Sequence, residues 1–198
     1  MLAMAISRAR SAGLENVRFE RGDAQVHGLP GAGFDTVGSR FGVMFFDDPH
    51  AAFANLARSL RSGGRVVVAC WQDLLANEWP MVPAGAAVAY VPMPDLGEAG
   101  GPARSRLPTP TASAPCWGGL AEVSVDDFRC LMPMGATVDD TVAFMQGTDI
   151  AARLIADVSE DVAGADWEAV RAALAPYAGH DGVVLGGDAW IVTATKPR

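Results

Sequence analysis

Residues 34–46, FDTVGSRFGVMFF, decide the fold class of this chain together with the segment GGRVVVACW at 63–71. The first segment begins as a strand. The second is rich in β-branched residues and does not alternate with polar ones, which is typical of a parallel strand covered on both faces. Between them, Asp48 and Pro49 predict the start of a helix that ends at the two glycines. The pattern therefore predicts a strand–helix–strand unit of an α/β sheet.

Further elements are expected on both sides of this unit. Before it, we expect a helix ended by Gly13 and a short strand at 17–21, where Val17 and Phe19 alternate with charged residues. After it, helical patterns cover 76–90 and several segments between 137 and 177, with Asp166 at the start of the last helix. AEVSV at 121–125 is a strand pattern. The C-terminal end predicts two strands paired as a hairpin around Gly186-Gly187.

Residues 95–119 differ from the rest because proline, glycine, serine and threonine dominate them and no apolar period survives. This composition indicates an irregular linker or loop.

The composition limits the classes of function. With 198 residues, 50% of them hydrophobic and 19% charged, the chain is long enough for one globular domain. A net charge of −8 argues against a nucleic-acid surface and against an anionic membrane, since both require basic residues. The three cysteines, Cys70, Cys116 and Cys130, show no metal-ligand spacing, so we expect a reduced, cytoplasmic protein without a metal site. The apolar stretches are too short to span a membrane.

Four segments together resemble the class I S-adenosylmethionine-dependent methyltransferases, and among them the small-molecule enzymes of the ubiquinone and menaquinone biosynthesis type. These segments are GDAQ at 22–25, FDTVGSRFGVMFF, LARSLRSGGRVVVACW at 56–71 and AWIVTATKP at 189–197. The resemblance covers most of 1–94 and 120–198. It implies a Rossmann-like sheet, mostly parallel, with an antiparallel C-terminal strand between its neighbours.

The resemblance also assigns an order to the strands. Residues 17–21 would be the third strand of the family, 34–40 the fourth and 64–71 the fifth, with AEVSV and the C-terminal end supplying the sixth and seventh. The first two strands and the glycine-rich loop would then precede Met1. We therefore expect 1–198 to be a single, N-terminally truncated methyltransferase domain, with a helical lid at 137–177, that binds the cofactor weakly or not at all.

By resemblance, S-adenosyl-L-methionine is the cofactor and two clusters would contact it. Asp23 and Ala24 would hold the adenine, with Gln25 beside it. Ser39, Arg40 and Phe41, at the carboxyl end of the fourth strand, would lie beside the methionine portion. Structural roles are the alternatives: Asp23 capping a turn, and Arg40 pairing with a nearby acid.

No catalytic residue is assigned. Methyl transfer from a sulfonium depends on alignment and on exclusion of water, so no base is obligatory. Among the histidines, His27 is the best candidate. Met44, Phe45 and Phe46 could wall a substrate pocket or pack in the core. The expected function is methyl transfer to a small-molecule acceptor. The alternative is a non-catalytic fragment or interaction module that uses its exposed sheet edge, for instance to form a homo-oligomer. A nicotinamide-dependent reductase is disfavoured because G-x-G-x-x-G is absent.

Overall fold

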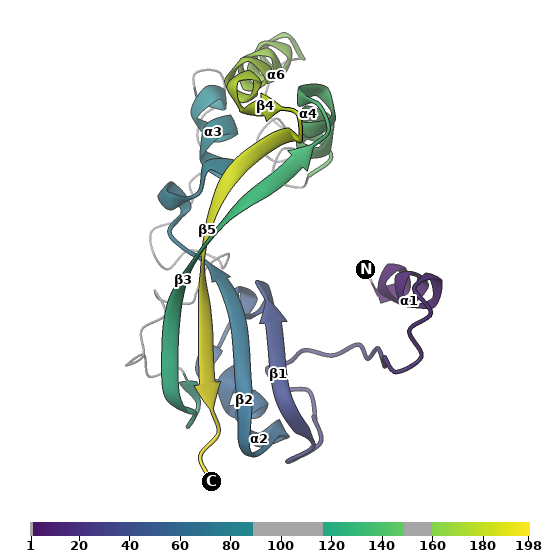
Figure 1. Ribbon diagram of the computed structural model, residues 1–198, viewed down its shortest axis with the longest axis vertical. Helices are drawn as coiled ribbons and strands as arrows, with labels where there is room; N and C mark the ends of the chain where they lie inside the picture. Colours follow the sequence, from purple (N-terminus) through teal and green to yellow (C-terminus); the bar gives the residue numbers. More distant parts are fainter. Residues whose placement is uncertain (1, 89–116, 149–159) are drawn as a thin grey trace.

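The computed structural model describes residues 2–88, 117–148 and 160–198 (Figure 1). Expectations for 95–116, and for a helix at 149–159, lie outside these ranges. The helices described are α1 (Leu2–Ser11), α2 (Pro49–Ser59), α3 (Glu78–Ala87), α4 (Val138–Gln146) and α6 (Glu160–Leu174), with short 3-10 turns η1 (Gly42–Phe45), η2 (Leu74–Ala76) and η4 (Ala175–Tyr177).

The sheet has the strand order β1 (Phe34–Arg40), β2 (Leu60–Trp71), β5 (Gly182–Thr195) and β3 (Ala121–Gly135), and the short β4 (Ala178–Gly179) pairs with β5. β1 and β2 are parallel neighbours, with Val37 opposite Val66. β5 runs antiparallel to both β2 and β3 and lies between them. The mostly parallel sheet with an inserted antiparallel C-terminal strand is therefore confirmed, as is the parallel pairing of the two segments that decided the fold class.

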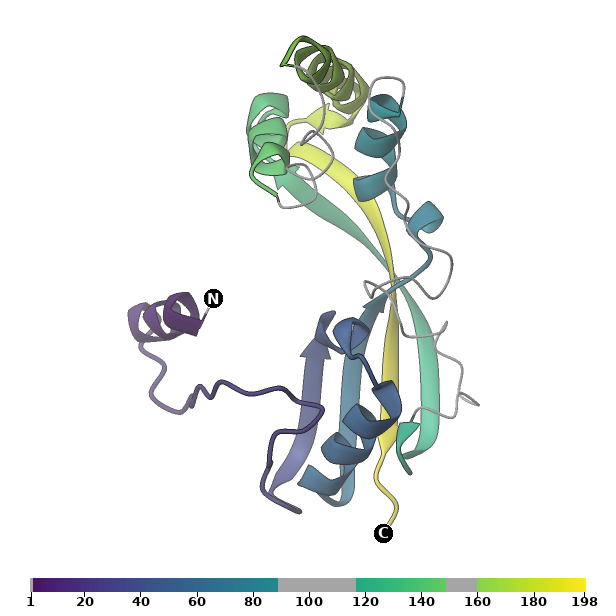
Figure 2. The same cartoon turned by 180° about the vertical axis from the view of Figure 1, so that it is seen from behind.

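One face of this sheet carries the main core. Val66, Val68 and Cys70 of β2 are at most 2% exposed and pack with Phe53 and Leu56 of α2. α2 begins as expected: the Asp48 carboxylate accepts a hydrogen bond from the Ala51 N–H at 3.0 Å, and Pro49 occupies the first helical position. Figure 2 shows α2 lying across this face. The opposite face shows the exposed side chains of Arg65 and Val67.

β3 and β5 continue beyond the end of β2 as a twisted two-stranded ribbon, and α3, α4 and α6 gather at its far end (Figure 1). A second hydrophobic cluster forms there from Val142, Val170, Leu174, Val183 and Leu185. None of these five residues belongs to the cluster against α2. The described chain thus contains two separate apolar cores joined by a ribbon and by the segment that leads into α3.

The N-terminal part stands apart from the body. α1 and the segment that follows it project sideways, and a gap separates them from β1 in both views (Figures 1 and 2). Residues 10–23 are exposed. We call residues 2–21 the arm.

Three expectations about elements are wrong. Residues 17–21 form no strand, because no neighbouring strand in the described ranges supplies their hydrogen bonds. The C-terminal end is one continuous strand rather than a hairpin, since its pairing with β3 runs through Gly186 and Gly187. α6 begins at Glu160, so Asp166 lies inside the helix rather than at its start.

Candidate functional site

The carboxyl ends of β1 and β2 lie side by side, at the edge where open α/β sheets bind their ligands. Arg40 is opposite Ala69, and the Phe41 N–H continues the ladder by donating to the Ala69 carbonyl at 2.9 Å. Ser39 is half-buried and Arg40 is exposed. The structure gives Arg40 no carboxylate partner among the described residues, so the alternative of a structural ion pair finds no support there.

Phe41 has an unusual backbone. Its φ of 65° and ψ of −6° place it in the left-handed region, which is costly for a bulky residue. Its ring stacks on Trp71 at the end of β2, with ring centroids 4.0 Å apart and planes 9° apart. The Trp71 ring in turn lies against the ring of Trp79 of α3, with ring centroids 5.4 Å apart. A row of three aromatic rings therefore borders this edge of the sheet, from β1 across β2 to α3.

The loop that carries Asp23, Ala24 and Gln25 is anchored to α2. The Gln25 side-chain oxygen accepts a hydrogen bond from the Asp48 N–H at 2.7 Å, at the start of the helix. Asn55, which is 5% exposed, donates to the carbonyls of Ala24 at 2.8 Å and of His27 at 3.0 Å. Asp23 is exposed and accepts from the Gln25 N–H at 2.9 Å, as a turn-capping residue does.

Asn55 was missed at the sequence level, although its position was informative. It lies between Phe53 and Leu56 on the buried side of α2. A polar residue there must satisfy its hydrogen bonds from the chain itself, and it does so by fixing the loop. His27 pairs with Glu20 at 2.7 Å, on the surface. This arrangement gives His27 a structural partner and no contact with the aromatic row.

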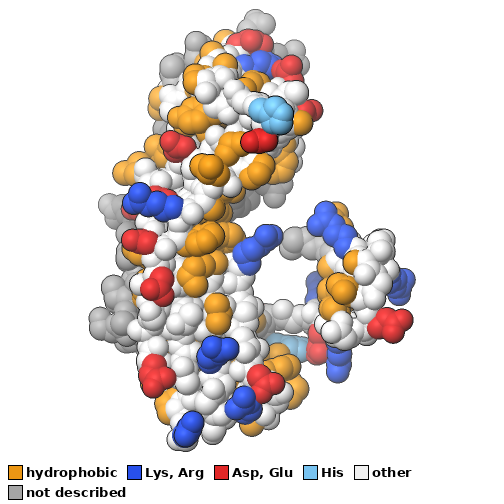
Figure 3. All heavy atoms as spheres, in the orientation of Figure 1, with side chains coloured by type: hydrophobic (Ala, Val, Ile, Leu, Met, Phe, Trp, Pro, Cys, Tyr) orange, Lys and Arg blue, Asp and Glu red, His pale blue; other side chains and the backbone are white. Residues whose placement is uncertain are grey.

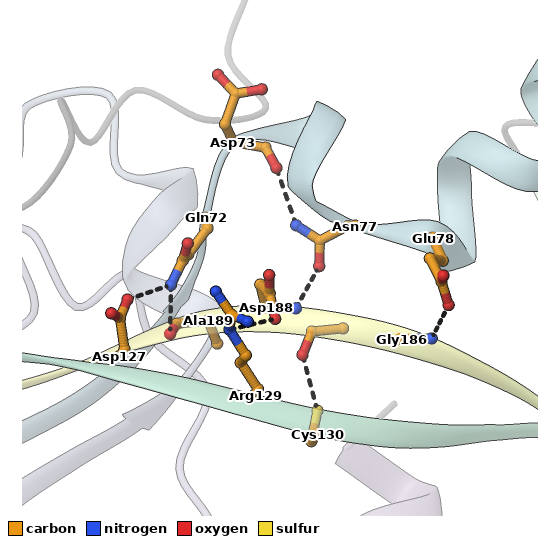
Figure 4. A network of polar contacts seen from close by, with 11 residues as sticks. Gln72, Asp73, Asn77, Glu78, Asp127, Arg129, Cys130, Gly186, Asp188 and Ala189 are labelled. Atoms are coloured by element: carbon orange, nitrogen blue, oxygen red, sulfur yellow. Dashed lines mark hydrogen bonds and ion pairs between the residues drawn. The ribbon is translucent and has the colours of Figure 1, made fainter.

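A cleft of about 350 Å³ opens just beyond the end of β2. Its lining includes Glu78 of α3, Arg129 and Cys130 of β3, and the Gly186–Asp188 stretch of β5. Figure 4 shows how α3 meets β5 there. The Gly186 N–H donates to the Glu78 carboxylate at 2.7 Å, and the Asp188 N–H donates to the Asn77 side-chain oxygen at 2.9 Å. The side chains of Glu78 and Asn77 thus accept hydrogen bonds from β5 beyond the point where its pairing with β2 ends.

The charges of this cleft are mixed. Arg129 lies 3.8 Å from Asp188, with its side chain mostly exposed. Gln72 donates to Asp127 at 2.8 Å and to the Ala189 carbonyl at 3.2 Å, which closes the network (Figure 4). Within the described ranges, no three His, Cys, Asp or Glu side chains gather as metal ligands. The chemistry open to this edge is therefore binding and orientation by aromatic rings, amides and single charges.

Comparison with known proteins bears on this architecture directly. Residues 1–68, which contain the anchored loop, β1, α2 and most of β2, match the family model described as a methyltransferase domain. An uncharacterized methyltransferase, YcgJ of Bacillus subtilis, is 35% identical over 82 residues, which are 41% of this chain and 31% of that protein. Residues 1–68 are thus similar to the methyltransferase-domain family. The family resemblance expected from the sequence is thereby confirmed.

One more relative and one solved structure show how far the likeness extends. The demethylmenaquinone methyltransferase of Thermus thermophilus is 41% identical over 86 residues, which are 43% of this chain and 35% of that enzyme. The matches thus span about a third of the length of these curated methyltransferases. The crystal structure of B. subtilis YcgJ superimposes with a TM-score of 0.54 at 15% identity, covering 100% of this chain and 79% of that one. This likeness supports the class I methyltransferase fold.

A methyltransferase structure from Bacillus halodurans also superimposes on this chain, with a TM-score of 0.52 at 15% identity, covering 100% of this chain and 79% of that one.

None of the helices in the described ranges is long and apolar enough to cross a membrane.

Proposed function

We propose that this chain contributes to S-adenosylmethionine-dependent methyl transfer to a small-molecule acceptor. The observation that carries this proposal is the parallel pairing of β1 and β2, which places Ser39 and Arg40 at the carboxyl edge of the sheet and stacks Phe41 on Trp71. When bound, the cofactor supplies an activated methyl group.

The residues at this edge fit part of such a cofactor. Arg40 is exposed and has no ion pair within the described part of the chain, so its guanidinium is open to a carboxylate such as that of the methionine portion. The strained Phe41 and the rings beside it form an apolar wall, and aromatic faces attract a sulfonium cation as they attract ammonium groups. The Asp23–Gln25 loop, held by α2, supplies a carboxylate and amides for hydrogen bonds to an adenine. The chain's own residues would thus bind and orient the cofactor from one side.

Affinity for the cofactor should be weak in the chain as given. The family resemblance places further contacts to the ribose and to the methionine portion on a glycine-rich loop and an acidic strand end that this sequence does not contain. Loss of two charge-assisted hydrogen bonds, at about 1.5–3 kcal/mol each, lowers affinity by several powers of ten. We therefore expect a dissociation constant in the millimolar range.

Nuclear magnetic resonance titration with S-adenosylhomocysteine tests this proposal, because it detects weak binding residue by residue. We expect the amide signals of 23–25 and 39–41 to shift together. Arg40→Gln should weaken binding about tenfold, whereas Arg65→Gln, at the other end of the sheet, should have no effect. Absence of any shift at these positions would remove the proposed function, and micromolar affinity would contradict the expected impairment.

One observation favours a second candidate function, an interaction module. In the described ranges no strand pairs with the outer edge of β1. An open edge of this kind is a template for another strand.

A further inference from the structure

We propose that the chain forms a dimer in which the outer edge of β3 pairs antiparallel with β3 of a second copy. The two-fold axis of this dimer passes between the Phe128 residues of the two copies. The inference concerns assembly and does not depend on methyl transfer. It starts from the sheet order, in which β3 is the last strand on the side away from β1, and no strand of the described ranges pairs with its outer edge (Figure 1).

The hydrogen bonds of β5 determine which backbone groups of β3 point outward. The Asp188 N–H donates to the Asn77 side-chain oxygen at 2.9 Å, and the Asp188 carbonyl accepts the Gln72 N–H at 3.0 Å. Both backbone groups of Asp188 therefore point to the side of β2 and α3. Because backbone groups alternate between the two sides of a strand, those of Ala189 point to β3, where Phe128 lies opposite.

The alternation continues along β3. Phe128 directs its N–H and its carbonyl to β5, so those of its neighbours Asp127 and Arg129 point to the outer edge. Those of Val125 and Leu131 point outward as well. The middle of β3 therefore presents a regular set of backbone donors and acceptors, and an edge of this kind is a template for another strand.

Charge selects one register for this pairing. In an antiparallel pair, residues that point outward in one copy face residues that point outward in the other. An axis at Asp127 or at Arg129 sets like charges against each other, and an axis farther along sets charged side chains against apolar ones. An axis at Phe128 instead sets Arg129 against Asp127 of the second copy and Val125 against Leu131. Because the interface is two-fold, each of these contacts occurs twice.

The side chains along this edge are accessible to a partner. Phe128 is 49% exposed and Leu131 is 77% exposed, although both are large and apolar. The Arg129 side chain is 82% exposed and lies 3.8 Å from Asp188, so other donors of its guanidinium remain for a second carboxylate. On the side of the molecule that β3 forms in Figure 1, Figure 3 shows basic and acidic side chains close together, with hydrophobic ones beside them. A second copy supplies the same mixture in the complementary order.

Cysteine cross-linking tests the register. Residues that face each other without mutual hydrogen bonds in an antiparallel pair have Cα atoms about 4.5 Å apart, which is a distance that a disulfide bridges. In the full chain carrying Cys116→Ser and Cys130→Ser, Phe128→Cys should give a disulfide-linked dimer with oxidised glutathione. Ser124→Cys is the matched control and should stay monomeric, because it lies on the same face of β3 but faces Met132 of the second copy.

Charge reversal tests the ion pairs. The unmodified chain should sediment as a dimer as its concentration rises, with hydrogen exchange at the amides of Asp127 and Arg129 slowed at least about tenfold relative to the dilute chain. Asp127→Arg sets arginine against arginine and should raise the dissociation constant of the dimer at least about tenfold, and so should Arg129→Asp, which sets acid against acid. The double variant restores unlike pairs and should regain the dimer, which excludes misfolding as the cause of the losses in the single variants.

Three results would overturn the proposal. The first is the absence of a disulfide-linked dimer of Phe128→Cys, or an equal amount from Ser124→Cys, since cross-linking traps even a weak dimer. The second is a dimer that survives Asp127→Arg unchanged. The third is a double variant that associates no more tightly than either single variant.

Discussion

The left-handed backbone of Phe41 opposes the stabilisation that its ring gains by stacking on Trp71. We expect Phe41→Ala to lower the free energy of unfolding by about 2–4 kcal/mol, because the contact is lost while the strained backbone remains. Phe41→Gly should cost about 1 kcal/mol less than Phe41→Ala, since glycine adopts this conformation without strain. Urea unfolding measures both.

The matched control is Phe45, which follows on η1 and is 59% exposed. There, substitution by alanine should change stability by less than about 0.5 kcal/mol. Equal stabilities of the alanine and glycine variants at Phe41 would show that its backbone is not strained in solution.

Asp166 is a buried carboxyl on α6. It is 3% exposed, and its Oδ1 atom has no hydrogen-bond partner among the residues that the structure describes. Burial raises the pKa of this carboxyl from its ordinary value of 3.8, because the charged form is poorly solvated. The folded chain therefore holds this proton more tightly than the unfolded chain does.

The sign of the pH effect follows from this difference. The stabilisation of the folded chain by its tighter binding of the Asp166 proton is fully present below the unfolded pKa of 3.8. It is lost as the pH rises through the raised pKa of the folded state. Asp166→Asn removes the titration, so the stability of the wild type relative to this variant should fall as the pH rises from about 3 to about 8. Asp166→Leu should raise the free energy of unfolding at neutral pH by about 1–3 kcal/mol. A constant difference between wild type and Asp166→Asn across this range would contradict the buried, unpaired carboxylate.

Among the elements, the start of α3 has a role beyond its own helix, since it closes the edge of β5. Asn77 is 2% exposed and accepts the Asp188 N–H, whereas Glu78 is exposed and accepts the Gly186 N–H. Asn77→Ala should cost about 1–3 kcal/mol because it leaves a part-buried N–H unpaired, and Glu78→Ala should cost less than about 1 kcal/mol because water replaces the carboxylate. Glu78→Ala therefore serves as the control, and hydrogen exchange at Asp188 should quicken in Asn77→Ala alone.

The main strands could be predicted because their residues decide their structure locally. The β-branched run at 64–71 and the FDTVGSR segment predict parallel neighbours, and they pair as expected. The expectation that both faces are covered is wrong, because Arg65 and Val67 are exposed on one face. The prediction of a hairpin turn at Gly186-Gly187 was wrong because glycine is typical both of turns and of strand positions that another segment approaches closely. In β5 these glycines permit close packing: a Cβ on Gly187 would lie 2.7 Å from the Met132 sulfur, and one on Gly186 would lie 2.9 Å from a Glu78 oxygen.

The prediction of a strand at 17–21 was wrong for another reason. Its alternation of Val17 and Phe19 with charged residues is typical of a strand, but a strand forms only beside a partner. The pattern along one segment carries no information about whether such a partner is present in the same chain.

For the molecule as a whole, two hydrophobic clusters joined by a ribbon predict two units of local unfolding. Leu174→Ala, in the cluster of α3, α4 and α6, should cost that cluster about 2–5 kcal/mol. Hydrogen exchange in the cluster of α3, α4 and α6 should quicken, whereas hydrogen exchange in β1 and β2 should stay unchanged. Phe53→Ala, in the cluster under the sheet, should do the reverse. If either substitution quickened exchange equally in both clusters, the chain would unfold as one unit.

The candidate site could be predicted in part. The residues at the end of β1 were found from the rule that ligands bind at the carboxyl ends of parallel strands, and the structure stacks one of them, Phe41, on Trp71. Their contact with a cofactor remains a prediction. Asn55, Trp71 and Asn77 could not be found from spacing alone, because their roles arise from contacts between segments far apart in the chain.

The ribbon of β3 and β5 sets the distance between the helical cluster and the sheet in discrete steps. Adding two residues to each strand would carry the cluster about 6.8 Å farther away and leave every side chain on its original side. Adding one residue to each would instead turn the inward side chains outward. Relatives that hold their helices nearer or farther should therefore differ here by even numbers of residues, so that the reach of the ribbon changes while the alternation of its side chains is preserved.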